Sequence, residues 1–150
     1  MSYSKQKKRG FTLIEILVVI GLIAVLAAIV LIAINPARQF RQARDSQRVS
    51  NVSAILNAVG QYLADHKGVL PIGIKEVKQK ISSGEANICS DLVPMYLPQL
   101  PSDPNATAVA SPCPATYDSG YSVVKDAAGR VTVSADGEEP LGTDNIAITR

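Results

Sequence analysis

Nineteen consecutive residues, from Ile16 to Ile34, carry no polar side chain. A helix of this length is long enough to cross the hydrocarbon core of a bilayer, which takes about 20 apolar residues. A chain of 150 residues cannot enclose such a rod within a core of its own. Either lipid or other copies of the chain must therefore cover this segment.

Charges mark the beginning of the apolar run. A compact basic cluster precedes Gly10 and contains Lys5, Lys7, Lys8 and Arg9. After it, Glu15 is the only charged residue between Phe11 and Arg38. A carboxylate within a membrane helix is costly, so its presence there calls for a functional reason.

Residues 5–15, Lys-Gln-Lys-Lys-Arg-Gly-Phe-Thr-Leu-Ile-Glu, resemble the class III signal of bacterial type IV prepilins and type II secretion pseudopilins. The resemblance extends over about residues 5–34. It implies that a membrane prepilin peptidase cleaves after Gly10 and methylates the new N-terminal residue, Phe11. It also implies that Glu15 helps copies of the chain, with an inner-membrane assembly platform, to form a filament.

Two simpler explanations could account for the apolar run. A secretory signal peptide has an apolar core of about 7–15 residues followed by a small-x-small cleavage site. This run is longer and continues into Asn-Pro-Ala-Arg at 35–38, which offers no such site. An uncleaved signal anchor is the stronger alternative, and the Gly-Phe-Thr-Leu-Ile-Glu context at 10–15 argues against it.

The basic residues indicate an orientation in the inner membrane. Lys and Arg cluster on the cytoplasmic side of a span, and the leader charges lie within a few residues of the run. A second basic group, Arg38, Arg41, Arg44 and Arg48, follows the span. We place the leader in the cytoplasm and the C-terminal domain outside. The second group is expected to contact water or lipid headgroups, or else to pair with Asp45 or with acids of neighbouring subunits.

The overall charge gives no indication of nucleic-acid binding. The net charge is +2, but the leader at 1–10 holds four of the 15 basic residues and none of the 13 acidic ones. The processed chain therefore has a net charge of about −2 and lacks a nucleic-acid-binding pattern. No nucleophile, base and orienting group stand out together, so we expect no enzymatic activity.

The remaining sequence predicts an α+β, pilin-like fold. We divide the chain into a cleaved leader (1–10), a transmembrane and assembly helix (11–35), an amphipathic helix (36–67) and an extracytoplasmic loop region with a β-sheet (68–150). Asn35 can cap the second helix and Pro36 suits its first position. Its apolar stripe comprises Val49, Val52, Leu56, Val59 and Leu63, flanked by Ile55 and Tyr62.

Alternation predicts a small antiparallel sheet after Gly120. Strands are expected over 121–125 and 131–135, joined by a turn at 127–129, with a last strand at 146–148. Residues 136–145 read as an acidic loop. Six of the nine prolines lie between Pro94 and Pro114, which excludes long helices there. A short helix or turn is expected near Val77–Ile81.

A second resemblance lies in the proline-rich segment. Leu97–Pro104 looks like the Leu-Pro-x-Asp-Pro turn of the type II secretion major pseudopilin. That family continues with Trp-Gly, whereas this chain has Asn105-Ala106 and no tryptophan. The resemblance therefore does not extend to the calcium site of that subfamily.

Two further groups of residues suggest sites in the outer domain. Cys89 and Cys113 predict a disulfide, because the domain lies in an oxidising compartment. Closing that loop would stabilise the fold by roughly 3–4 kcal/mol. No cofactor is expected, although clustered oxygens could ligate calcium. The candidate ligands are Asp136, Glu138, Glu139 and Asp144.

These features predict a prepilin-like structural subunit stored in the membrane and assembled after cleavage. The cleaved Phe11 amine of one copy and the Glu15 carboxylate of another would each supply the charge partner that an apolar bundle otherwise lacks. The alternative is a signal-anchored extracytoplasmic binding domain that does not polymerise. Whether the filament is a type IV pilus or a secretion pseudopilus remains open from the sequence.

Overall fold

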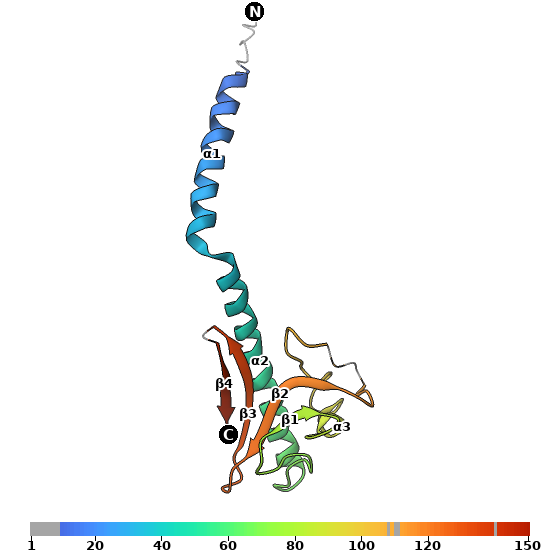
Figure 1. Ribbon diagram of the computed structural model, residues 1–150. Helices are drawn as coiled ribbons and strands as arrows, with labels where there is room; N and C mark the ends of the chain where they lie inside the picture. Colours follow the sequence, from blue (N-terminus) through green and yellow to red (C-terminus); the bar gives the residue numbers. More distant parts are fainter. Residues whose placement is uncertain (1–9, 108, 110–111, 140) are drawn as a thin grey trace, which may run out of the picture. The chain divides into compact units, whose positions relative to one another are not determined.

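The computed structural model describes residues 10–107, 109, 112–139 and 141–150, with only the backbone of Ile34 and residues 141–144. The chain forms two compact units, Met1–Gln39 and Phe40–Arg150. The first unit contains the apolar helix, and the second contains most of the following helix together with a small sheet (Figure 1).

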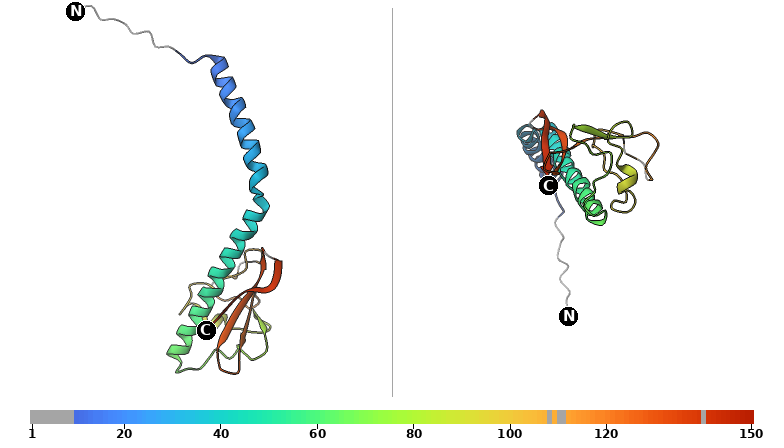
Figure 2. Two further views of the ribbon diagram at one scale, coloured as in Figure 1. Left: turned by 90° about the vertical axis from the view of Figure 1, so that its left-hand side faces the viewer. Right: turned by 90° about the horizontal axis from the view of Figure 1, so that it is seen from below.

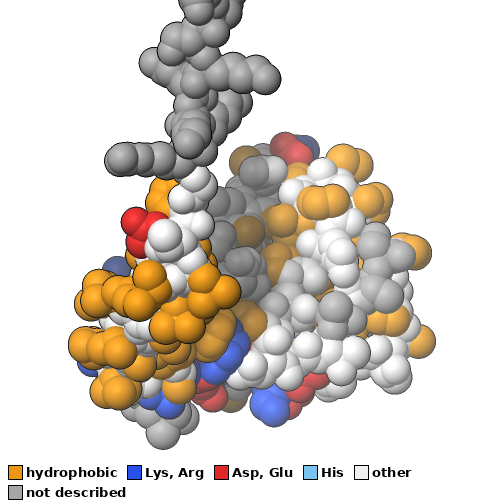
Figure 3. All heavy atoms as spheres, turned by 90° about the horizontal axis from the view of Figure 1, so that it is seen from above, with side chains coloured by type: hydrophobic (Ala, Val, Ile, Leu, Met, Phe, Trp, Pro, Cys, Tyr) orange, Lys and Arg blue, Asp and Glu red, His pale blue; other side chains and the backbone are white. Residues whose placement is uncertain are grey.

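Helix α1 spans Leu13–Ile34. It begins at Thr12, whose hydroxyl accepts the N–H of Glu15 and thereby caps the first turn. Its described side chains are exposed, and Leu13–Ala33 is long and apolar enough to cross a membrane, with a mean hydropathy of 3.4. Hydrophobic side chains accordingly gather over this helix in Figure 3.

Helix α2 spans Pro36–Asp65, so the helical segment is interrupted at Asn35, as the sequence predicts. Asn35 adopts a left-handed conformation with φ of 45°, and its Oδ1 accepts the N–H of Arg38 at 3.4 Å. Pro36 lacks an N–H and therefore loses nothing at the first helical position. The chain leaves α2 through Lys67 and Gly68, both at positive φ.

The sheet has four antiparallel strands in the order β1-β2-β3-β4. The strands are β1 (Gln79–Ser82), β2 (Asp118–Lys125), β3 (Val131–Glu138) and β4 (Leu141–Thr149). A short helix, α3, spans Cys89–Leu92. Helix α2 lies along one face of the sheet (Figure 2). The expected α+β, pilin-like fold is confirmed.

Two local expectations are wrong. The segment 136–145 is not a loop, because β3 continues to Glu138 and β4 starts at Leu141. Asn145 Oδ1 accepts the N–H of Gly137 at 2.6 Å across this hairpin. A Cβ at Gly137 would lie 2.6 Å from that oxygen, so a larger residue there would displace the Asn145 side chain. The segment near Ile81 is strand rather than helix, because it pairs with β2 and buries Ile81.

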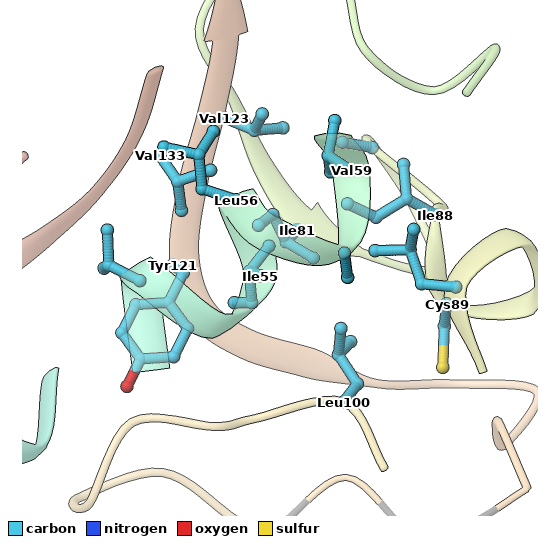
Figure 4. Packing of buried hydrophobic residues seen from close by; sticks show 14 of the residues in the cluster. Ile55, Leu56, Val59, Ile81, Ile88, Cys89, Leu100, Tyr121, Val123 and Val133 are labelled. Atoms are coloured by element: carbon cyan, nitrogen blue, oxygen red, sulfur yellow. The ribbon is translucent and has the colours of Figure 1, made fainter. Parts of the chain in front are cut away.

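The core lies between α2 and the sheet (Figure 4). Ile55 and Leu56 from α2 point toward Tyr121, Val123 and Val133 from β2 and β3 (Figure 4). The buried face of α2 consists of Val52, Ile55, Leu56, Ala58 and Val59. The apolar stripe therefore holds at its centre. Its first predicted member, Val49, is 45% exposed.

A disulfide joins Cys89 of α3 to Cys113 in the proline-rich segment, with Cα atoms 5.8 Å apart. The backbone N–H of Cys89 also donates to the hydroxyl of Tyr117 at 3.2 Å. The cross-link holds a segment with little regular structure against the core, where Cys89 is almost fully buried. Among the described residues, no cysteine is free.

Candidate functional site

Glu15 lies in the first turn of α1, beside the expected cleavage position. Its Oε2 accepts the backbone N–H and the hydroxyl of Thr12, both at 2.8 Å. Thr12 and Glu15 therefore form a reciprocal capping box that satisfies donors at the helix start. Within the part of the chain that the structure describes, no donor contacts the other oxygen, Oε1.

The residues around the expected cut are accessible. Phe11 is 86% exposed, Gly10 is exposed, and α1 starts only at Leu13. A backbone outside a helix can enter a protease site in the extended form that such sites require, and glycine adds no side chain there. The predicted basic residues of the leader, Lys5, Lys7, Lys8 and Arg9, lie outside the described residues.

A buried arginine forms the centre of a second polar cluster, in the outer domain. The guanidinium of Arg48 on α2 is only 3% exposed and makes a bidentate contact with Asp103, at 2.5 Å and 3.0 Å. It also pairs with Asp45 at 2.7 Å and with Glu138 at 2.8 Å. Three carboxylates from three segments thus compensate one buried cation, which offsets the cost of desolvating it.

The same cluster holds the β3–β4 hairpin against α2. Arg44 makes a bidentate contact with Glu138, and Arg41 pairs with Glu139 at 3.2 Å. Asp45 accepts the backbone N–H groups of Glu138 and Glu139 at 2.7–3.0 Å. We call this set (Arg41, Arg44, Asp45, Arg48, Asp103, Glu138 and Glu139) the arginine clamp.

The arginine clamp decides between the expectations for the basic group after the membrane span. The expected pairing with Asp45 is confirmed for Arg48. Contact with water or lipid headgroups is wrong for Arg41, Arg44 and Arg48, because they pair with acids of their own chain. Apart from Asp45, their partners lie 55 to 98 positions away in the sequence. A local pattern cannot reveal such contacts.

Asp103 gives the turn at Leu97–Pro104 a structural role. Its carboxylate receives Arg48 and the N–H of Asn105 at 2.8 Å, while its own N–H donates to Ser119 O at 2.8 Å. Gly120, at φ of +78°, lies against it, and a Cβ there would be 2.7 Å from the Asp103 Cβ. The turn therefore joins α2 to the start of β2.

Ion pairs and hydrogen bonds lower the pKa values of two clamp carboxylates, Glu138 and Asp45. The guanidinium of Arg44 lowers the pKa of Glu138 to about 2, with further help from Arg48 and Asn105. Burial alone would raise the pKa of Asp45, but hydrogen bonds from Glu138, Arg48 and Glu139 outweigh it and lower that pKa. Both carboxylates are therefore held in the charged form.

We expect the free energy of unfolding to fall as the pH falls from about 4.5 toward about 2. Across that window unfolded Glu138 binds a proton while folded Glu138 stays charged, so acid favours the unfolded chain. Denaturant titrations at several pH values measure the slope. Glu138→Gln should make the decline shallower, whereas Glu76→Gln, at an exposed position, should not. Equal slopes in both variants would contradict this role.

The calcium hypothesis concerned four acids at 136–144. The structure engages Glu138 and Glu139 with arginines, and the side chain of Asp144 lies outside the described residues. No group of three or more metal-binding side chains occurs among the residues described. Calcium binding stays a prediction, and no contact in the structure supports it.

Comparison with known proteins agrees with the N-terminal features. Residues 5–31 match the family model for the prokaryotic N-terminal methylation motif, which is the signal of type IV pilins and pseudopilins. The matched segment contains Gly10, Phe11 and Glu15 together with most of α1. No curated protein and no solved structure matches the chain.

Proposed function

We propose, from the N-terminal methylation signal that the chain carries, that this protein is a structural subunit of a type IV pilus or type II secretion pseudopilus. A prepilin peptidase would cleave after Gly10 and methylate Phe11, and an inner-membrane platform would add the subunit to a filament. The observation that carries the proposal is the match over residues 5–31, with Glu15 at the start of an exposed apolar helix.

Membrane storage precedes assembly in this proposal. The apolar helix and the methylation motif fit a membrane-anchored protein. We place the leader in the cytoplasm and the domain with the Cys89–Cys113 disulfide outside, where disulfides persist. On leaving the bilayer, α1 must exchange lipid for another apolar surface, and the same helices of neighbouring copies supply one.

Cleavage would control assembly through a single charge pair. Before the cut, the Phe11 nitrogen is an amide with no positive charge. After it, that nitrogen is a cationic amine, which an apolar bundle tolerates only beside an anion. Glu15 can hold Thr12 through Oε2 and receive the amine of another copy through Oε1. The pair would also fix the axial register of otherwise smooth apolar helices.

The processing step is tested by intact-mass analysis of the membrane-extracted protein. In cells that contain the peptidase, we expect loss of residues 1–10 and one added methyl group on Phe11. Gly10→Val, which places a branched side chain at the cut, should leave the leader attached. In cells with an inactive peptidase, the wild-type chain should also keep its leader.

An N-terminus at Met1 or Ser2 in peptidase-containing cells would remove the prepilin proposal. It would favour the alternative, a signal-anchored extracytoplasmic domain that does not polymerise. Processed chains that form no filament beside a complete assembly machinery would favour the same alternative. Filaments sheared from the cell surface and membrane-retained monomer are compared by quantitative immunoblot.

A further inference from the structure

The two edges of the sheet differ in how their backbone groups are satisfied. On the β1 edge, the N–H of Lys80 donates to Glu85 at 2.7 Å, and its carbonyl accepts the N–H of Ala86 at 3.0 Å. The chain therefore closes this edge itself. Strand β4 is the other end of the sheet, and no further strand of the described residues pairs with its outer edge (Figure 1).

Register identifies the β4 groups that point away from β3. Arg150 and Val131 exchange both backbone hydrogen bonds, at 2.7 Å and 3.0 Å, and Ile148 pairs with Val133 two residues earlier. In an antiparallel ladder, hydrogen-bonded and non-hydrogen-bonded pairs alternate. The backbone N–H and C=O of Ala147 and Thr149 therefore point outward, and the structure places no other described segment against them.

The last residues of β4 do not protect this edge, although the β3–β4 register is irregular nearer the hairpin, between Ala135 and Gly137. Natural edge strands are usually shielded by lysine, proline, bulges or short length. From Asn145 to Thr149 the strand carries neither a charge nor a proline. Its inward residues, Ile146 and Ile148, pack on the core but stay only partly buried. An additional strand on this edge would pair with the outward backbone groups of β4 and would also cover the exposed parts of Ile146 and Ile148.

Two hollows lie beside this edge, along α2. One, of about 340 Å³, is lined by residues that include Ser46 and Val49 of α2 and Ile146 of β4. The other, of about 470 Å³, is lined by residues that include Asn57 and Gly60 of α2 and Arg150 after β4. Between these two hollows, the α2 residues that are not buried include Ser50, Ser53 and Ala54, which are small and uncharged.

We propose that the outer edge of β4 is an assembly contact at which a second copy of this chain adds an extended segment. Backbone hydrogen bonds at an edge are similar for most sequences, so they give attachment with little selectivity. Such a contact requires a partner at high local concentration. Copies held by α1 in one membrane or filament meet that requirement. This inference rests on the proposed function.

The contact is tested in the full chain, in cells with the peptidase and assembly machinery. A photo-reactive phenylalanine derivative placed at Thr149 should cross-link two copies of the chain. The same group at Val77, which is 72% exposed near the closed β1 edge, should not. Cross-links from Thr149 to a different protein, or no cross-links, would overturn the proposal.

A backbone substitution provides the second test. Ala147→Pro removes only an outward N–H, which β3 does not use, and places a ring where the added strand would pair. The Thr149 cross-link should fall about tenfold or more, whereas Ala147→Ser should keep it. A melting temperature close to that of wild type establishes that the variant folds. If the Ala147→Pro variant does not fold, the proposal is judged from the Thr149 and Val77 cross-links in the chain that keeps Ala147.

The outcomes separate this contact from the proposed function. Chains that keep their leader would remove the proposed function. Processed chains that form filaments and give no cross-link from Thr149 would remove only the β4 contact. Undiminished cross-linking in folded Ala147→Pro would show that backbone pairing is not what joins the copies, and would likewise overturn the proposal.

Discussion

Arg48→Ala is expected to lower the free energy of unfolding of the outer domain by about 3–5 kcal/mol. The substitution removes a guanidinium that is 3% exposed and leaves Asp45, Asp103 and Glu138 close together without their shared cation. Like charges repel strongly where little water separates them. Because α2, the Asp103 turn and the β3–β4 hairpin all meet at Arg48, the loss should be felt across the domain.

Two control variants make the expectation specific. Arg44→Ala also removes a partner of Glu138, but the Arg44 side chain is 35% exposed, so only the small loss typical of a surface ion pair is expected. Arg48→Lys keeps the charge but cannot reproduce the bidentate contact with Asp103. Its loss of stability should lie between those of Arg44→Ala and Arg48→Ala. Denaturant titration of the detergent-solubilised chain, followed by tyrosine near-ultraviolet circular dichroism, measures all three. Equal losses for Arg44→Ala and Arg48→Ala would contradict the buried role.

The features that the sequence predicted well depend on neighbours within a turn or two. Asn35 caps α2 through the residue three positions later, and Pro36 needs only its own ring geometry. The apolar stripe of α2 follows from helical period alone, so its centre at Val52, Leu56 and Val59 is buried as expected. Val49 is 45% exposed, because the helical period does not show how far the sheet extends along α2.

The features that the sequence missed depend on distant partners. The acidic composition of 136–145 indicated a solvated loop. The folded chain neutralises Glu138 with Arg44, 94 residues away, so this segment can form a hairpin. Ile81 was assigned to a helix or turn because its four-residue strand is too short to show alternation. Its strand character comes from pairing with β2.

The candidate site was predicted in part. Gly10, Phe11 and Glu15 were identified through the motif, and the match over residues 5–31 supports that signal. The capping box between Thr12 and Glu15 was missed, although the Thr-x-x-Glu spacing signals it. It gives Glu15 a role within its own helix, which any test of assembly must separate from the proposed contact with another copy.

Glu15→Ala is expected to reduce filament yield by about tenfold or more while membrane insertion stays intact. An amine left without its anion in an apolar bundle costs several kcal/mol, and 1.4 kcal/mol already corresponds to about a factor of ten. Insertion should be unaffected or easier, because the substitution removes a carboxylate from the span. Sheared filaments are quantified against membrane-retained monomer, with the mass of the processed N-terminus as a check on cleavage.

Thr12→Ala is the matched control, because it removes the hydroxyl that caps α1 and keeps the carboxylate. If Glu15 acts through a charge pair with another copy, Thr12→Ala should assemble much better than Glu15→Ala. Glu15→Gln, which keeps the shape and loses the charge, should resemble Glu15→Ala. Equal defects in Thr12→Ala and Glu15→Ala would instead assign Glu15 to helix capping. Wild-type yield from Glu15→Ala would exclude the charge pair, because the Phe11 amine would then need no anion in the filament.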